Sequence, residues 1–193
     1  MIELNNFTYK TNRILFEGAN FIAPSIGIIG IAGESGCGKT TFLKIISKQI
    51  HLDSMVNTAT SIFYGNQDAL LKKDLTIIQQ FELIESIYNR EHDQNTIDEL
   101  FKNLNINANL SQKYDSCSLG EKKRIMIALS VYSNSPCIIL DEPLSSVDYE
   151  DKHSIMKLLK EYSHDRVIIL TIHDEEFDEY LDIKYLIENL QFT

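Results

Sequence analysis

Apolar residues follow two spacings along this chain, one typical of strands and one typical of helices. Short continuous apolar runs at 26–32 and 137–140 suit strands that are buried on both faces of a parallel sheet. From Lys39 onward the apolar positions recur at helical spacing. The expected strands are 2–7, 20–23, 26–32, 61–64, 137–140, 167–171 and 183–187. Beyond the helix from Lys39, the expected helices are 76–88, 96–104, 120–132, 149–162 and 175–180.

Strands and helices alternate near both ends of the chain, with a helical stretch between them. Alternation of this kind predicts right-handed crossovers and a mostly parallel sheet. Residues 70–115 show no strand pattern, so we expect a helical insert there. The sequence therefore predicts an α/β fold with N-terminal antiparallel strands and a helical subdomain insert.

Composition narrows the class of protein. The chain has 193 residues, which fits a single domain, and 44% of them are apolar, as in globular proteins. A net charge of -10 repels phosphate backbones, so we expect no nucleic-acid partner. Cys37, Cys117 and Cys137 form no CxxC pair, and we interpret them as reduced thiols in a cytosol. We find neither a signal peptide nor an apolar run of about 20 residues, so we expect another chain to do any membrane spanning.

A glycine-rich segment between the run 26–32 and the following helix matches the phosphate-binding-loop pattern. Glycines let the backbone wrap around phosphates, and the helix N-terminus presents N–H groups to them. We expect Lys39 to bind the β- and γ-phosphates and the Thr40 hydroxyl to ligate Mg²⁺. The loop by itself would also fit a kinase, a GTPase or a motor. The expected nucleotide-binding residues here are Gly33, Glu34, Ser35, Gly36, Cys37, Gly38, Lys39, Thr40 and Thr41.

Two carboxylates, Asp141 and Glu142, directly follow the apolar run 137–140. Ligands bind at the carboxyl ends of strands in open α/β sheets. We expect Asp141 to hold the Mg²⁺ and Glu142 to polarise the attacking water. Adjacent carboxylates with separate roles predict hydrolysis of ATP rather than transfer to an acceptor.

Two further segments make the sequence resemble one family. Residues 117–124, Cys-Ser-Leu-Gly-Glu-Lys-Lys-Arg, resemble the signature motif of the ATP-binding-cassette (ABC) ATPases, and residues 143–148 resemble the loop after their acidic strand. The resemblance covers nearly the whole chain. It implies a P-loop NTPase core formed by residues 1–69 and 135–193, and a helical subdomain at 70–134 that includes the signature.

The resemblance also implies roles for single residues. Tyr9 resembles the aromatic residue that stacks on adenine. Gln67 resembles the glutamine that contacts both the metal and the attacking water, with Gln79 and Gln80 as alternatives. His173 resembles the histidine that donates a hydrogen bond to the γ-phosphate.

In this family the signature completes the nucleotide pocket of the opposite subunit, so the resemblance implies a head-to-tail dimer holding two ATP molecules. Ser118, Gly120 and Asp148 would contribute from the second subunit. Leu119 stands where the family has glycine, so hydrolysis could be slow or the partner subunit could differ. We also hypothesise that oxidation or alkylation of Cys37 blocks ATP binding.

The function we expect is the ATPase subunit of an ABC transporter, cytoplasmic and peripheral on the inner face of the membrane. It would dock on a separate polytopic transmembrane subunit through a groove near Gln67 and the insert. A homodimer is expected and a heterodimer stays open; export of a peptide or antimicrobial compound is favoured over import. The alternative is a soluble non-transport ABC ATPase, such as an iron–sulfur cluster assembly factor. The signature and the acidic pair argue against a P-loop kinase of small molecules.

Overall fold

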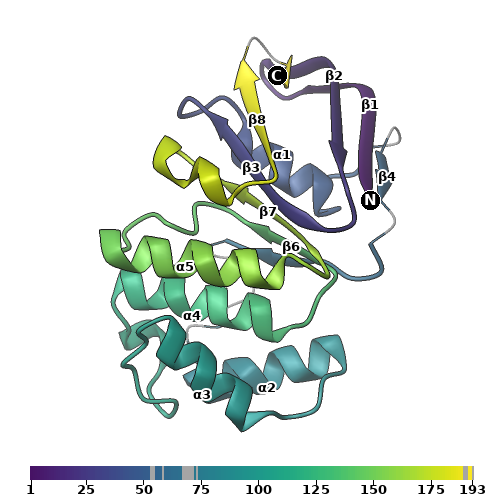
Figure 1. Ribbon diagram of the computed structural model, residues 1–193. Helices are drawn as coiled ribbons and strands as arrows, with labels where there is room; N and C mark the ends of the chain where they lie inside the picture. Colours follow the sequence, from purple (N-terminus) through teal and green to yellow (C-terminus); the bar gives the residue numbers. More distant parts are fainter. Residues whose placement is uncertain (53–54, 58, 67–71, 73, 189–190, 193) are drawn as a thin grey trace.

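A computed structural model describes residues 1–52, 55–57, 59–66, 72, 74–188 and 191–192. It has two sheets at one end of the molecule and a layer of helices at the other (Figure 1). The strands are β1 (Ile2–Lys10), β2 (Ile14–Ala23), β3 (Gly27–Gly33), β4 (Met55–Asn57), β5 (Phe63–Gly65), β6 (Cys137–Leu140), β7 (Val167–Thr171), β8 (Ile183–Glu188) and β9 (Gln191–Phe192). The helices are α1 (Lys39–Ile46), α2 (Ile77–Tyr88), α3 (Gln94–Asn103), α4 (Leu119–Tyr132) and α5 (Tyr149–Tyr162), with 3-10 helices η1 (Tyr114–Ser116) and η2 (Glu175–Tyr180).

The larger sheet has the strand order β5-β6-β7-β3-β8-β9. Its strands pair in parallel from β5 through β8, and β9 adds an antiparallel pair at the edge. Every residue of β6 and β7 is buried, as expected for strands covered on both faces. Because β3 lies between β7 and β8, its carboxyl end opens beside the end of β7, close to where β6 also ends.

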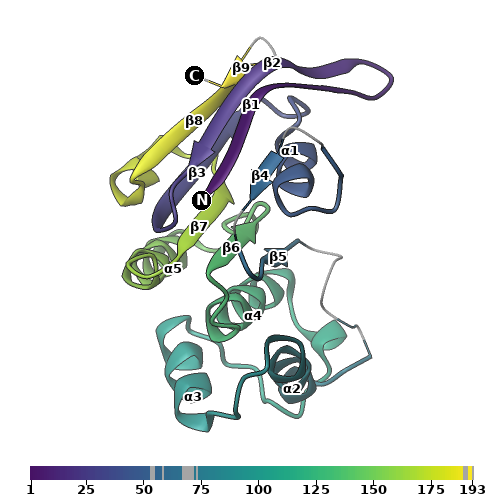
Figure 2. The ribbon, with the colours of Figure 1, turned by 90° about the vertical axis from the view of Figure 1, so that its right-hand side faces the viewer.

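A second sheet, in the order β2-β1-β4, is antiparallel and contains the N-terminal hairpin. Its apolar face packs on α1 through aromatic rings, with the Phe21 and Phe42 ring centroids 4.7 Å apart. The turn of the hairpin extends beyond α1 (Figure 2). It reaches the loop between β3 and α1, where the Arg13 guanidinium donates a hydrogen bond to the Gly36 carbonyl.

Helices α2 and α3 pack on α4 away from the sheets (Figure 1). The Phe81 and Tyr132 rings meet edge to face with centroids 5.0 Å apart. Residues 125–132 of α4 are all buried, because this helix also contacts β5. Within the described part of the chain, no helix is both long and apolar enough to cross a membrane.

The predicted fold class is confirmed, and most predicted elements are present at nearly the predicted bounds. Several details differ. β1 extends to Lys10 rather than residue 7, and β5 covers Phe63–Gly65 rather than 61–64. β2 begins at Ile14 rather than at residue 20, 175–180 is a 3-10 helix, and α4 begins at Leu119 rather than Gly120. The short strands β4 and β9 were not predicted.

Candidate functional site

The phosphate-binding loop runs from the end of β3 at Gly33 to the start of α1 at Lys39. Gly38 caps the helix with φ 114°, a backbone conformation that favours glycine, and a Cβ at this position would lie 3.2 Å from the Phe16 ring. Lys39 is only 7% exposed. Its Nζ donates to the carbonyls of Gly33 at 2.7 Å and Glu34 at 2.9 Å, so its charge is held on the inner side of the loop.

A cavity of about 350 Å³ opens beside this loop. It gathers residues that are far apart in sequence: the loop, the hairpin turn, the acidic segment after β6 and the histidine after β7. Its lining is Thr11, Arg13, Leu15, Ser35, Gly36, Gly38, Lys39, Thr40, Thr41, Glu142 and His173. The structure therefore brings Lys39, Thr40, Glu142 and His173 around one space.

One hydroxyl contacts both acidic residues that follow β6. Thr171, at the end of β7, donates through Oγ1 to Asp141 Oδ1 at 3.2 Å and accepts from the Glu142 N–H at 2.6 Å. Asp141 is 9% exposed, whereas the Glu142 side chain is 49% exposed. This arrangement keeps the Asp141 carboxylate in place and leaves the Glu142 carboxylate directed to the cavity.

Glu142 has a left-handed backbone with φ 51°, which is uncommon for a residue other than glycine. Its carbonyl accepts hydrogen bonds from Lys123 Nζ and Ser145 Oγ, both at 2.9 Å. Burial lowers the pKa of Lys123, while the carboxylates of Glu142 and Asp141 act in the opposite direction. On the cavity side, His173 Nε2 lies 3.9 Å from Glu142 Oε1.

Other predicted residues lie outside this cavity. Tyr9 is half-buried in β1 and packs against the hydrophobic core that contains Phe16 and Phe42. Ser118 caps α4, Gly120 lies in its first turn, and exposed Asp148 precedes α5. Gln67 is outside the described residues.

The two alternative glutamines both have structural partners. Gln79 is in a capping box with Thr76 at the start of α2. Gln80 is 1% exposed, and its amide accepts from the Lys72 N–H and donates to the Lys72 carbonyl. Gln80 therefore fastens α2 to the segment that precedes it.

Cys37 is half-buried and lines a second hollow of about 490 Å³, together with Gly33 and Ile187. Cys117 and Cys137 are buried, and burial raises the pKa of both thiols. No group of three or more His, Cys, Asp or Glu side chains suited to a metal occurs among the residues that the structure describes. Of the expected Mg²⁺ ligands in that part, Thr40 lines the cavity and Asp141 is the carboxylate fixed by Thr171.

Sequence reasoning missed Arg13, Lys123 and Thr171. Arg13 Nη2 donates to the Gly36 carbonyl at 2.6 Å and supplies a second cation to the lining. A lone arginine in a turn, a lysine in a helix and a hydroxyl at a strand end carry no signal in a single sequence, because their partners lie far along the chain.

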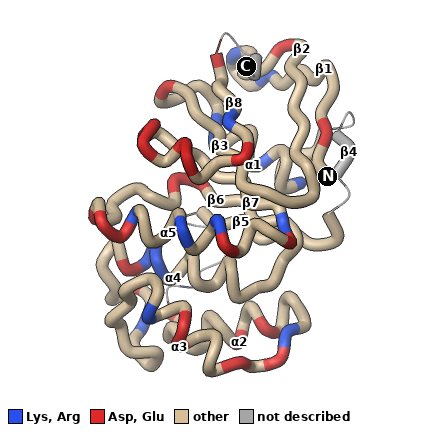
Figure 3. The backbone as a smooth tube through the Cα atoms, viewed as in Figure 1, with Lys and Arg blue, Asp and Glu red and all other residues tan. Residues whose placement is uncertain are grey.

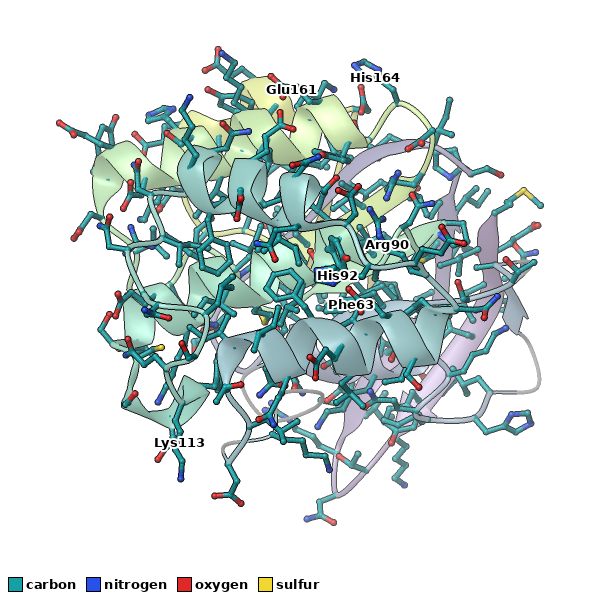
Figure 4. All side chains as sticks on the ribbon, turned by 90° about the horizontal axis from the view of Figure 1, so that it is seen from below. Phe63, Arg90, His92, Lys113, Glu161 and His164 are labelled. Carbon is teal, nitrogen blue, oxygen red and sulfur yellow. The ribbon has the colours of Figure 1, made fainter. Side chains whose placement is uncertain are left out.

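A third hollow, of about 550 Å³, lies between residue 61, the α2–α3 connection and the end of α4. Its lining is Ser61, Tyr88, Asn89, Arg90, Glu91, His92, Asp93, Ser133 and Asn134. Figure 4 shows Arg90 and His92 between α2 and α3. The Arg90 guanidinium stacks 4.1 Å from the Tyr132 ring centroid, and the hydrogen bond to Glu85 raises the pKa of His92.

Known proteins share a family model, sequence identity and fold with this chain. The family described as ABC transporter matches residues 16–145. The chain is 30% identical over 191 residues to the cytochrome c biogenesis ATP-binding export protein CcmA of Reclinomonas americana, covering 90% of this chain and 85% of the relative. It is 25% identical over 182 residues to the molybdate import ATP-binding protein MolC of Haemophilus influenzae, covering 89% of this chain and 72% of the relative.

Solved structures share the fold. An ABC transporter ATP-binding protein from Pyrococcus furiosus aligns with a TM-score of 0.82 at 19% identity, over 96% of each chain. The ATP-binding cassette MJ0796, solved as a dimer in a post-hydrolysis state with ADP and phosphate, aligns with a TM-score of 0.82 at 22% identity, over 100% of this chain and 96% of the other.

Proposed function

This chain belongs to the ABC transporter family as an ATP-binding subunit, and we propose that it hydrolyses ATP to ADP and phosphate to drive transport through a separate membrane subunit. One observation carries the proposal: the cavity beside the phosphate loop is lined by Lys39, Thr40, Glu142 and His173 together. A binding loop, a carboxylate and a hydrogen-bond donor around one space are what hydrolysis of a phosphoanhydride needs.

Lys39 would bind the β- and γ-phosphates. In doing so its ammonium exchanges the carbonyls of Gly33 and Glu34, which now accept from it, for phosphate oxygens. The first N–H groups of α1 add donors and the positive end of the helix dipole. Arg13, which also lines the cavity, adds positive charge on the hairpin side.

Thr40 and Asp141, together with Gln67, would hold Mg²⁺. The oxygen donors present fit this ion, because Mg²⁺ binds through few protein ligands and keeps water and phosphate oxygens as the rest. Mg²⁺ would neutralise charge on the transferred phosphoryl group.

Glu142 would take the proton of the attacking water, because its carboxylate faces the cavity while its backbone is fixed. His173, 3.9 Å from that carboxylate, would donate to the γ-phosphate. Tyr9 would stack on adenine. These roles assign the chemistry to side chains of β1, α1 and the loops after β6 and β7.

The other half of each site would come from a second ATPase subunit. Ser118, Gly120 and Asp148 lie outside the cavity of their own chain, and we propose that they contact nucleotide bound by the partner. The membrane subunit would dock near residue 67 and the helical insert. The hollow between residue 61, the α2–α3 connection and the end of α4 offers Arg90 and His92 to such a partner.

Export of a peptide or antimicrobial compound is the direction we favour. The relatives include both an export protein and an import protein by name, so similarity alone does not choose between directions.

Affinity purification under mild detergent tests the transporter assignment. Recovery of a polytopic membrane protein supports it, and its consistent absence favours a non-transport ATPase.

Replacement of the proposed base tests the chemistry. Glu142→Gln should retain ATP affinity and lower the hydrolysis rate by about 10²–10⁴-fold, the usual cost of losing a general base. Lys39→Ala should instead weaken ATP binding, which separates the two steps. Wild-type turnover in Glu142→Gln would remove this residue from its role.

A further inference from the structure

Helix α4 directs a buried lysine to the backbone of Glu142. Lys123 is 2% exposed, and its Nζ donates to the Glu142 carbonyl at 2.9 Å. Burying an amine that can carry a charge is costly unless it is well partnered. Burial lowers the pKa of Lys123, and the nearby carboxylates of Glu142 and Asp141 oppose this effect. A residue that is costly for folding is expected where function requires it.

The backbone that Lys123 contacts is strained. Glu142 has φ 51°, and such a conformation persists only where its surroundings hold it. Thr171 holds the N–H side, and Lys123 holds the carbonyl side. Ser145 also donates to this carbonyl, but it belongs to the same turn and therefore connects Glu142 to no other element.

The next residue of α4 holds the far end of the same loop. Arg124 forms an ion pair with Asp151 in the first turn of α5, and Asn105 donates to the other oxygen of that carboxylate at 2.7 Å. Near its start, α4 lies against the middle of the loop, where a Cβ on Gly120 would be 3.0 Å from the Ser146 carbonyl. These contacts therefore couple the position of the loop from Glu142 to α5 to the position of α4.

We propose that Lys123 is a positioning residue that holds Glu142 toward the phosphate-loop cavity and links its orientation to the signature helix. The inference rests on the proposed function, in which Glu142 activates water and Ser118, the cap of α4, contacts the partner's nucleotide. A nucleotide contact at Ser118, at the start of α4, is then coupled through the Lys123 hydrogen bond to the orientation of Glu142 in the same chain.

Lys123→Met removes the donor but keeps most of the side-chain volume. We expect kcat for ATP hydrolysis to fall about 10–100-fold, as for loss of a hydrogen bond from a charged group, with KM and ATP affinity changed less than about twofold. Thermal stability should change little, because the Glu142 carbonyl still accepts from Ser145 Oγ and methionine needs no partner in a buried site. Lys123→Gln, whose amide can donate, should recover part of the rate. Lys102→Met, the same change at an exposed position of α3, is the control and should behave as wild type.

A second measurement separates positioning from a general structural effect. If Lys123 acts through the Glu142 carboxylate, Lys123→Met should not lower the residual rate of Glu142→Gln any further. Wild-type kcat in Lys123→Met, or an undiminished further loss in the Glu142→Gln background, would overturn the inference. If Lys123→Met does not fold, the same pair of tests applies to Lys123→Gln. Absence of any turnover in the wild-type protein would instead overturn the proposed function, and the inference with it.

Discussion

Thr171 uses one hydroxyl to hold both acidic residues that follow β6. Its Oγ1 accepts from the Glu142 N–H at 2.6 Å and donates to Asp141 Oδ1 at 3.2 Å. Since Thr171 is 2% exposed, water is not a ready substitute for either bond. The side chain thereby couples the position of the proposed metal ligand to that of the proposed base.

Thr171→Val keeps the shape of the side chain and removes the hydroxyl. We expect a loss of about 1–3 kcal/mol in the free energy of unfolding, because two partner groups lose a buried hydrogen bond. We also expect kcat to fall about tenfold and the Mg²⁺ concentration for half-maximal activity to rise. Urea unfolding and a Mg²⁺ titration of ATPase activity measure these effects. Thr171→Ser, which keeps the hydroxyl, should remain near wild type; equal losses in both variants would contradict the assignment.

For single residues, sequence motifs predicted several that the structure places around the phosphate loop. Lys39, Thr40, Glu142 and His173 meet at one cavity as expected. Arg13 was missed because its partner is a loop carbonyl 23 residues away, and no local pattern encodes that contact. The roles proposed for these residues remain predictions.

Helices α2 and α4 begin in the same way, which provides an internal comparison at the scale of elements. Each starts with a capping box: Thr76 with Gln79 at α2, and Ser118 with Glu121 at α4. In both, the N-cap hydroxyl accepts a hydrogen bond from the backbone N–H three residues later. The side chain of that later residue in turn accepts a hydrogen bond from the N-cap N–H. Only the α4 cap is proposed to contact nucleotide.

Ser118→Ala and Thr76→Ala should therefore cost similar stability, about 0.5–2 kcal/mol each. Their activities should differ, because only Ser118 is proposed to bind the partner subunit's ATP. We expect Ser118→Ala to lower ATPase activity well beyond Thr76→Ala when both are assayed below their unfolding transitions. Equal activity in the two variants would indicate that Ser118 serves only as a helix cap.

Elements with a continuous apolar run or a clear helical period were predicted well, and the three-residue strand β5 was predicted from its apolar residues, whereas β4 and β9 were not. Buried strands such as β6 and β7 form continuous apolar runs, and α5 has clear helical spacing. β4 and β9 have three and two residues, too few to show any alternation. β2 was predicted only in part, because Glu17 and Gly18 interrupt its apolar pattern.

At the scale of the whole molecule, one cavity gathers only part of the proposed site. The cavity gathers the phosphate loop, Glu142 and His173, while Ser118 and Asp148 lie elsewhere on the same chain. Acidic residues gather on η2 and the first turn of α5 (Figure 3), and the net charge is -10. Two such chains repel each other at low salt, so association needs specific contacts that offset this repulsion, and we propose that contacts to bound nucleotide supply them. The division into a core and a subdomain at 70–134 also remains a prediction.

A second copy of this chain is the simplest partner for the incomplete site. Glu142→Gln should bind ATP without consuming it, so the bound nucleotide should hold two chains together. With Mg-ATP at 0.15 M salt, light scattering should give twice the monomer mass of 22.2 kDa. ADP, or addition of Ser118→Ala to the same variant, should return the monomer, because either change removes contacts proposed to cross the interface. A monomer mass under saturating ATP, with ATP binding verified in the same sample, would contradict a homodimer and favour a different ATPase partner, a reading consistent with Leu119 in the signature.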